Sequence, residues 1–96
     1  MGDRMQAKVE QYETMLATGL EAIRIAARED SPLWELGEEH REMAASYLED
    51  GRHFLEAGDL PNALAAFSYG HGWLDAGVRS GLLAAPTDID VFAIRS

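Results

Sequence analysis

Apolar residues recur along most of this chain at alternating intervals of three and four, the spacing that places side chains on one face of an α-helix. The first such stripe predicts a helix over residues 3–29 with Asp3 as its N-cap. Ser31-Pro32 ends it, because a residue that precedes proline avoids helical dihedrals. The apolar and small residues of this stripe are Met5, Val9, Tyr12, Leu16, Gly19, Ile23 and Ala26.

A connector with the sequence SPLWELG follows, over residues 31–37. We expect Leu33, Trp34 and Leu36 to fold over one end of the helices as a hydrophobic lid. Trp34 is assigned to the core rather than to a ligand, because large aromatic side chains most often fill space there.

Two further helices are predicted over residues 38–57 and 60–80. Gly58 suits the left-handed position that ends a helix, and Asp59 suits the N-cap of the next one, with Pro61 in its first turn. So short a connection makes these two helices an antiparallel hairpin. The residues expected to point inward from the earlier helix are Met43, Ala44, Tyr47, Leu48, Gly51, Phe54 and Leu55.

Glycines on the third helix predict close packing. Ala63, Gly70 and Gly77 are spaced by seven residues and fall on one line of the helix. An interior helical glycine costs about 1 kcal/mol relative to alanine, so a buried line of glycines indicates that a neighbouring helix approaches the main chain. The residues assigned to structural packing are Gly51, Ala63, Phe67, Gly70, Leu74 and Gly77. Gly72 lies on the opposite side, where the pattern gives it no packing role.

The last segment, residues 82–96, is predicted to be a short tail docked on the helices. Apolar and acidic residues alternate from Asp88 to Val91, a pattern too short to distinguish helix from strand. We expect this tail to lie extended with Phe92 buried. The predicted fold is therefore an all-α three-helix bundle, a single domain over residues 1–96 in which the first helix fills the groove of the hairpin.

Composition restricts the classes of function. The chain has 96 residues and no cysteine, so packing must hold it together without disulfides, as in a reducing cytoplasm. Its 17 acidic and 8 basic residues give a net charge of −9, which opposes binding to nucleic-acid phosphates. Acid excess with a single lysine, Lys8, is typical of a salt-rich cytoplasm, where charge repulsion is screened. No apolar run is long enough for a membrane span or signal peptide, so we expect a cytoplasmic protein.

Candidate chemistry is concentrated on the third helix. His71, Asp75 and Arg79 are spaced by four residues and form a row along one flank. One interpretation is a solvated row of hydrogen bonds, and the other makes His71 a general base or metal ligand oriented by Asp75. Tyr69 and Trp73 on the other flank could stack on a planar ligand, seal the bundle or meet another subunit.

The remaining histidines do not complete a metal site in this prediction. His40 and His53 lie on the second helix, and the hairpin geometry places His53 opposite Leu64 rather than His71. Metal chemistry needs three or four convergent ligands. The sequence also has no serine elbow, phosphate-binding glycine loop or HExxH motif. We therefore assign no catalytic residue, no metal and no cofactor.

The stretch SYLEDGRHFLEAGDLPNALAAFSYGHGWLDAGVRSGLL resembles the archaeal family catalogued as domain of unknown function 357 (DUF357), most strongly over residues 44–82. The resemblance is carried by Gly58-Asp59, residues 62–65, residues 67–69 and residues 71–79. It implies a small all-helical protein from an archaeon and supplies no activity. The hairpin also resembles a single tetratricopeptide unit, although stable arrays of that repeat need about three copies.

Two functions follow as hypotheses. The first is a non-enzymatic helical module that binds a protein partner or a second copy of itself, because a bundle this small leaves many apolar side chains uncovered. The second is a small-ligand or nucleotide-handling protein, a weak hydrolase or metal-assisted, that uses His71, Asp75 and Arg79. The candidate surface in either case comprises Tyr69, His71, Trp73, Asp75 and Arg79. Neither a nucleic acid nor a membrane is expected as a partner.

Overall fold

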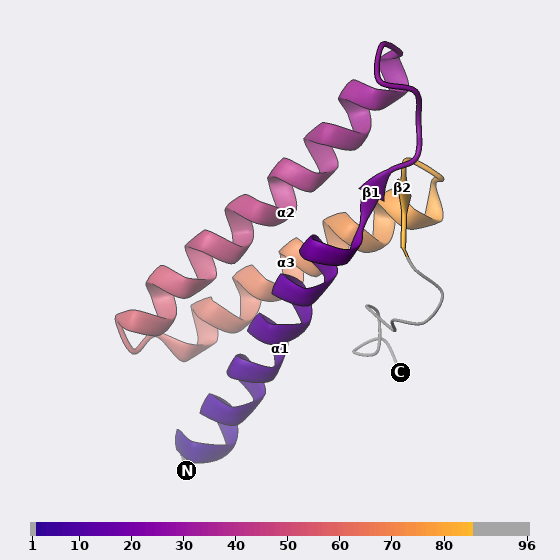
Figure 1. Cartoon of the computed structure of the whole chain (residues 1–96). Helices are drawn as coiled ribbons and strands as arrows, with labels where there is room; N and C mark the ends of the chain where they lie inside the picture. The colour runs from indigo at the N-terminus through magenta and orange to yellow at the C-terminus, as the bar shows by residue number, and fades with distance from the viewer. Residues whose placement is uncertain (1, 86–96) are drawn as a thin grey trace.

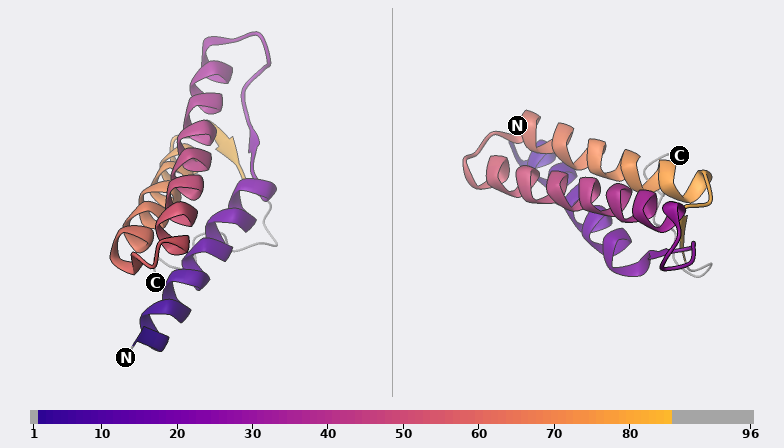
Figure 2. Two further views of the ribbon diagram at one scale, coloured as in Figure 1. Left: turned by 90° about the vertical axis from the view of Figure 1, so that its left-hand side faces the viewer. Right: turned by 90° about the horizontal axis from the view of Figure 1, so that it is seen from above.

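The computed structural model describes residues 2–85 as three helices and two short strands (Figure 1). In chain order these are α1 (Gly2–Ala22), β1 (Arg24–Ile25), α2 (Pro32–Glu56), α3 (Leu60–Arg79) and β2 (Leu83–Ala84). Helices α2 and α3 pack side by side as an antiparallel hairpin, and α1 lies across one face of it (Figure 2). The predicted three-helix fold with a helical hairpin is confirmed.

The turn between α2 and α3 has the predicted chemistry. Gly58 adopts a φ of 78°, the left-handed conformation that favours glycine. Asp59 caps α3, because its Oδ1 accepts a hydrogen bond of 3.3 Å from the backbone N–H of Asn62. The other carboxylate oxygen accepts from the Asn62 side-chain amide at 2.7 Å. The two helices are therefore joined through one left-handed residue and one cap.

The core lies where α1 meets the hairpin. Its fully buried large side chains are Val9, Leu16, Phe67 and Leu74. Gly70 lies at the centre, and a Cβ atom built on it would be 2.7 Å from Leu16 Cδ2 and 3.2 Å from the Ala44 carbonyl oxygen. The missing side chain thus lets α1 and α2 both approach the main chain of α3. The Phe67 ring likewise occupies the space where a side chain at Gly51 of α2 would lie.

Gly77 is buried as predicted, but a different element covers it. A Cβ atom at this position would lie 2.5 Å from Leu83 Cδ1. Leu83 belongs to β2, so the expected contact between helix main chains is wrong at Gly77. The chain turns back at Gly81, whose φ is 82°, and brings β2 against the last turns of α3.

Helix α1 ends at Ala22, seven residues before the predicted end at residue 29. The next residues form β1, which pairs antiparallel with β2 in the register Arg24 with Ala84 and Ile25 with Leu83. β-branched isoleucines on both sides of Arg24 favour an extended chain, and the distant β2 segment supplies the hydrogen-bonding partner. The predicted tail begins with β2, whereas its residues 86–96, including Phe92, lie outside the described residues.

Helix α2 begins at Pro32, so the predicted connector over residues 31–37 is wrong. Ser31 is the N-cap, and its Oγ accepts a hydrogen bond of 3.2 Å from the Trp34 backbone N–H. The expected lid is wrong as well, because Leu33 is 56% exposed and Leu36 is 42% exposed. Trp34 is half-buried. The Ser-Pro pair starts a helix here, since proline at its first position loses no hydrogen bond.

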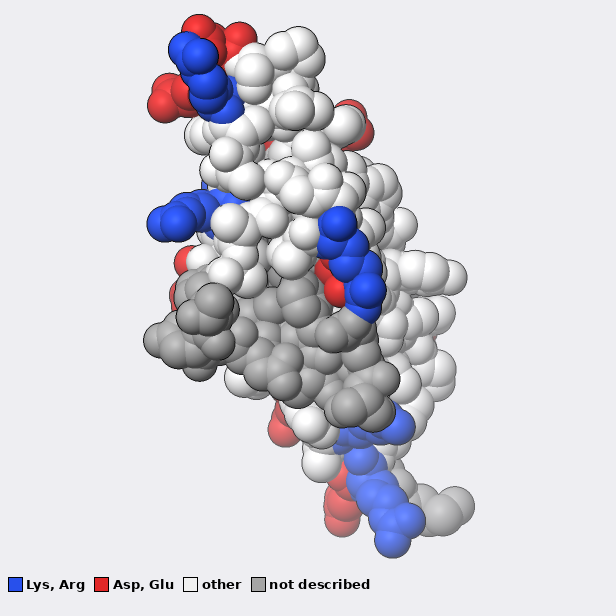
Figure 3. All heavy atoms as spheres, turned by 90° about the vertical axis from the view of Figure 1, so that its right-hand side faces the viewer, with Lys and Arg blue, Asp and Glu red and all other residues white. Residues whose placement is uncertain are grey.

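Acidic and basic side chains are interspersed on one face of the described surface (Figure 3). On the face shown in Figure 3, basic side chains occur from one end of the described chain to the other and lie close to acidic ones. No helix among residues 2–85 combines the length and the apolar character that crossing a bilayer requires.

Candidate functional site

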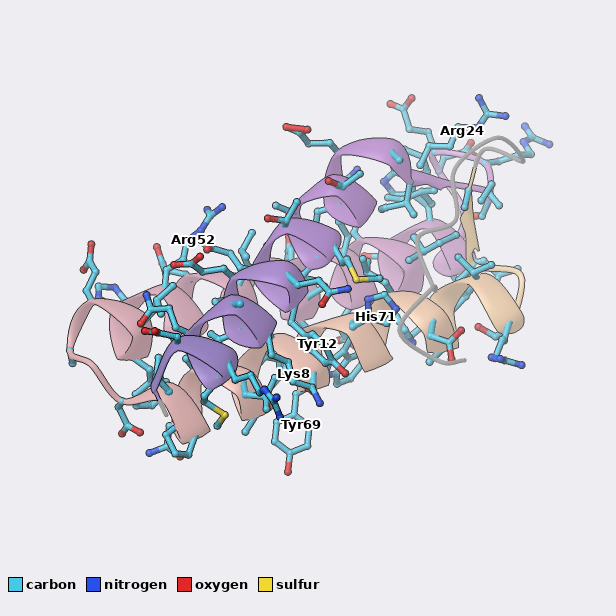
Figure 4. All side chains as sticks on the ribbon, turned by 90° about the horizontal axis from the view of Figure 1, so that it is seen from below. Lys8, Tyr12, Arg24, Arg52, Tyr69 and His71 are labelled. Atoms are coloured by element: carbon cyan, nitrogen blue, oxygen red, sulfur yellow. The ribbon has the colours of Figure 1, made fainter. Side chains whose placement is uncertain are left out.

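The predicted site residues lie on two different sides of α3. Figure 4 shows Tyr69 projecting away from the helices, whereas His71 lies among them. The exposed fractions agree, since Tyr69 is 64% exposed and His71 is 4% exposed. The structure therefore divides the predicted surface into a buried part at His71 and an exposed aromatic part at Tyr69.

His71 is not on a solvated flank. Burial lowers the pKa of its imidazole from the ordinary 6.5, and the nearby Asp75 carboxylate partly opposes this by raising it. Asp75 is itself engaged by Arg79, whose Nε lies 2.9 Å from Asp75 Oδ2 and 3.0 Å from Oδ1. The predicted pairing of Asp75 with Arg79 is present, while the imidazole is held in its neutral form at neutral pH.

The other histidines lie apart from His71. The His40 ring packs edge-on against Trp73 with ring centroids 5.0 Å apart, and its Nδ1 donates a hydrogen bond of 2.9 Å to the Leu36 carbonyl. His53 is exposed on α2. Among residues 2–85, no group of three or more histidine, aspartate or glutamate side chains is arranged to hold a metal ion.

A second set of side chains forms a surface that the sequence did not single out as a unit. It comprises two rows, one on each helix of the hairpin, which we call the open face. Its members are Leu36, His40, Met43, Tyr47 and Phe54 of α2 with Tyr69 and Trp73 of α3. The α2 members are spaced by four, three, four and seven residues, the repeat of a single helical stripe.

Ring contacts join the two rows across the hairpin. Tyr47 and Tyr69 pack with ring centroids 5.6 Å apart, and His40 and Trp73 make the corresponding contact nearer the other end. Three side chains of the open face are substantially exposed, at 64% for Tyr69, 42% for Leu36 and 37% for Phe54. The open face therefore combines a stripe along α2 with two aromatic side chains of α3, and ring contacts join them at two places.

The open face points away from α1. Arg52 of α2 reaches toward α1 and donates from Nε to Glu13 Oε2 at 2.7 Å. Phe54 follows two residues later, which places it about 200° around α2 from Arg52. Helix α1 thus covers one side of the hairpin, while the open face lies on the other.

Charged residues at the edge of the open face are acidic. Glu39 and Asp50 are exposed on α2 next to its stripe. Arg41 and Arg52 are eleven residues apart, which puts both on the α1 side of the helix. From Leu60 to Leu74, α3 carries no aspartate, glutamate, lysine or arginine. The open face consequently has a negative edge on α2 and an uncharged edge on α3.

The sequence contains a signal for this surface. The pattern predicts one inward stripe on the second helix, but Met43, Tyr47 and Phe54 of that stripe lie on the open face. The core stripe of α2 is narrower and centres on Ala44 and Gly51, which are its buried residues along with Gly37. The apolar positions of α2 cover a wider arc than packing against α1 and α3 can bury. That excess width is the signal of a second surface.

Comparison with known proteins gives a family without an activity. Residues 11–83 match the family model described as protein of unknown function (DUF357). The fold is similar to the crystal structure of a DUF357 protein from Archaeoglobus fulgidus, with a TM-score of 0.71 and 20% sequence identity over 88% of this chain and 96% of that one. No curated protein matches the chain. The matched segment runs from α1 to β2 and includes the whole hairpin.

Proposed function

The chain belongs to the DUF357 family of proteins of unknown function, and from that premise we propose that it is a non-enzymatic helical module that binds another protein through the open face. The observation that carries the proposal is the exposure of Tyr69, Leu36 and Phe54 on the side of the hairpin opposite α1. Either a different protein or a second copy of the chain fits this proposal. The absence of cysteine supports a cytoplasmic setting for this interaction.

The residue types of the open face support a role in binding. Tyrosine, tryptophan, phenylalanine and methionine are enriched at protein interfaces, where they supply large contact areas. Covering exposed apolar surface contributes roughly 25 cal/mol for each Å² removed from water. A partner laid along both rows would therefore gain most from the three side chains that are now most exposed.

The small-ligand alternative has weaker support. It needs His71 to reach a bound molecule, but that imidazole is 4% exposed. It also needs Asp75 to orient His71, and the Asp75 carboxylate is at the same time paired with the Arg79 guanidinium. The open face is accessible without any rearrangement of the described residues.

A charge placed on the open face tests the proposal. We expect Tyr69→Glu to abolish binding, while Ser68→Glu, at a neighbouring exposed position about 100° around the helix, leaves it intact. Partners would be captured from the native host with each variant and identified by mass spectrometry. A photoreactive residue at position 54 would show that they contact this face, and sedimentation would detect self-association.

The proposal is supported if the unmodified chain and Ser68→Glu capture the same identified partner or form the same dimer. Tyr69→Glu should then lose that partner or that dimer. A monomer whose captured proteins are the same for both variants would overturn the proposal.

A further inference from the structure

We infer that the occupant of the open face is an amphipathic helix of another protein, with basic side chains along one edge. This inference rests on the proposed function, because it specifies the partner that the open face would bind. Its two supports are the shape of the hairpin and the sign of the charges beside the open face.

The hairpin already packs one helix against its opposite side. Helix α1 crosses that side and contacts both α2 and α3 (Figure 2), with Leu16 placed over Gly70. The open face offers a second pair of parallel rows on the other side of the same hairpin. Rows with this spacing accept the ridge of a third helix, as in other helix-in-groove complexes.

The length of the open face sets the length of the partner helix. Leu36 and Phe54 mark the ends of the exposed α2 row and are eighteen residues apart. At 1.5 Å per residue, this row spans about 27 Å. A helix of about 18 residues would cover it.

Charge selects a basic partner over a second copy of this chain. Glu39 and Asp50 lie exposed along the α2 edge, and the described basic side chains of α2 point to the α1 side. Two copies paired through this face would gain no charge attraction from these edges, because neither edge carries a lysine or arginine, and the net charge of each chain is already −9. A basic edge on the partner would instead face Glu39 and Asp50, while its apolar stripe would face Tyr69 and Trp73.

Two synthetic peptides test this charge preference. The first is an 18-residue helix of leucine and lysine with one apolar face, and the second has glutamate in place of every lysine. Binding to the full chain would be measured by calorimetry at low salt and again at higher salt. We expect the lysine peptide to bind at least about tenfold more tightly and to weaken as salt is added.

Matched variants separate a specific edge from general attraction to an acidic protein. Glu39→Gln with Asp50→Asn removes the charges beside the open face, and we expect about fivefold weaker binding of the lysine peptide. Glu49→Gln with Glu56→Gln removes two exposed charges from the other side of the same helix. This control should change the affinity by less than about twofold.

Each of the other outcomes overturns a stated part of the inference or of the proposed function. Equal weakening by both double variants, or equal binding of both peptides, would overturn the basic edge. A dimer that Tyr69→Glu dissociates, with neither peptide bound, would identify a second copy as the occupant; this overturns the inference and leaves the proposed function standing. A monomer that binds neither peptide, and whose captured proteins do not depend on Tyr69, would overturn both.

Discussion

At the residue scale, Gly70 and Gly72 are two glycines of one helix in opposite environments. A Cβ atom on Gly70 would lie 2.7 Å from Leu16 Cδ2 and 3.1 Å from Tyr47 Cβ, whereas one on Gly72 would meet nothing within 4 Å. Both lie inside α3, so both carry the same cost in helix propensity. The two positions therefore differ only in the packing around them.

Gly70→Ala is expected to lower the free energy of unfolding by about 2 kcal/mol. The added methyl group must displace Leu16 or push α3 away from the Ala44 carbonyl, and that strain exceeds the gain in helix propensity. Denaturant unfolding monitored by circular dichroism would measure the change.

Gly72→Ala is the matched control on the same helix. It is expected to raise the free energy of unfolding by roughly 0.5 to 1 kcal/mol, because alanine restricts the unfolded chain and clashes with nothing. Similar effects of the two substitutions would contradict the packing described for Gly70.

His71 makes stability depend on pH. Burial lowers the pKa of its imidazole below the ordinary 6.5, so the unfolded chain binds a proton more readily than the folded one. The free energy of unfolding should therefore fall as pH drops through 6.5 toward the lower folded value, and this contribution should be fully present above pH 6.5. Unfolding curves between pH 5 and 7 would measure the slope of the free energy of unfolding against pH. This range brackets the unfolded pKa of about 6.5.

Two histidine variants identify the source of that slope. His71→Gln should flatten it, whatever the variant does to stability overall, while His53→Gln on the exposed side of α2 should retain it. A slope that persists in His71→Gln would show that another group is responsible.

At the element scale, the start of α2 departs from the pattern by six residues. The apolar spacing predicts a helix from residue 38, because Ser31-Pro32 has the sequence of a helix break. Six more residues are helical, since Ser31 caps the N-terminus and Pro32 occupies a position that needs no N–H donor. The exposed Leu33 and Leu36 belong to this added part.

Ser31→Ala is expected to cost about 1 kcal/mol in the free energy of unfolding and to loosen the first turns of α2. The hydrogen bond from the Trp34 N–H to Ser31 Oγ would be lost. Amide hydrogen exchange over residues 33–37 would detect the loosening. Unchanged exchange there would contradict the cap, and exchange in α3 serves as the internal reference.

At the scale of the whole molecule, a net charge of −9 on 96 residues disfavours the compact state through self-repulsion. We expect the melting temperature to rise between low and molar sodium chloride, because salt screens repulsion between exposed carboxylates. Thermal melts at a series of salt concentrations would measure it. A flat or falling response would count against adaptation to high salt.

The sequence by itself determined the features that depend on neighbouring residues. Helical spacing placed three helices, and the turn chemistry at Gly58 and Asp59 predicted the hairpin, because both depend on local dihedrals and hydrogen bonds. The burial of Gly70 was also predictable, since an unfavourable residue on an apolar line needs a packing reason.

Only the tertiary structure decided what depends on residues distant in sequence. Helix α1 stops at Ala22 because the Arg24–Ile25 strand pairs with a segment nearly sixty residues later, and His71 is buried although its helical row looked solvated. The apolar arc of α2 divides into a core stripe and an open face only once α1 covers one side of the hairpin. A single helical period tells which residues share a face, and the packing of other elements decides which faces water reaches.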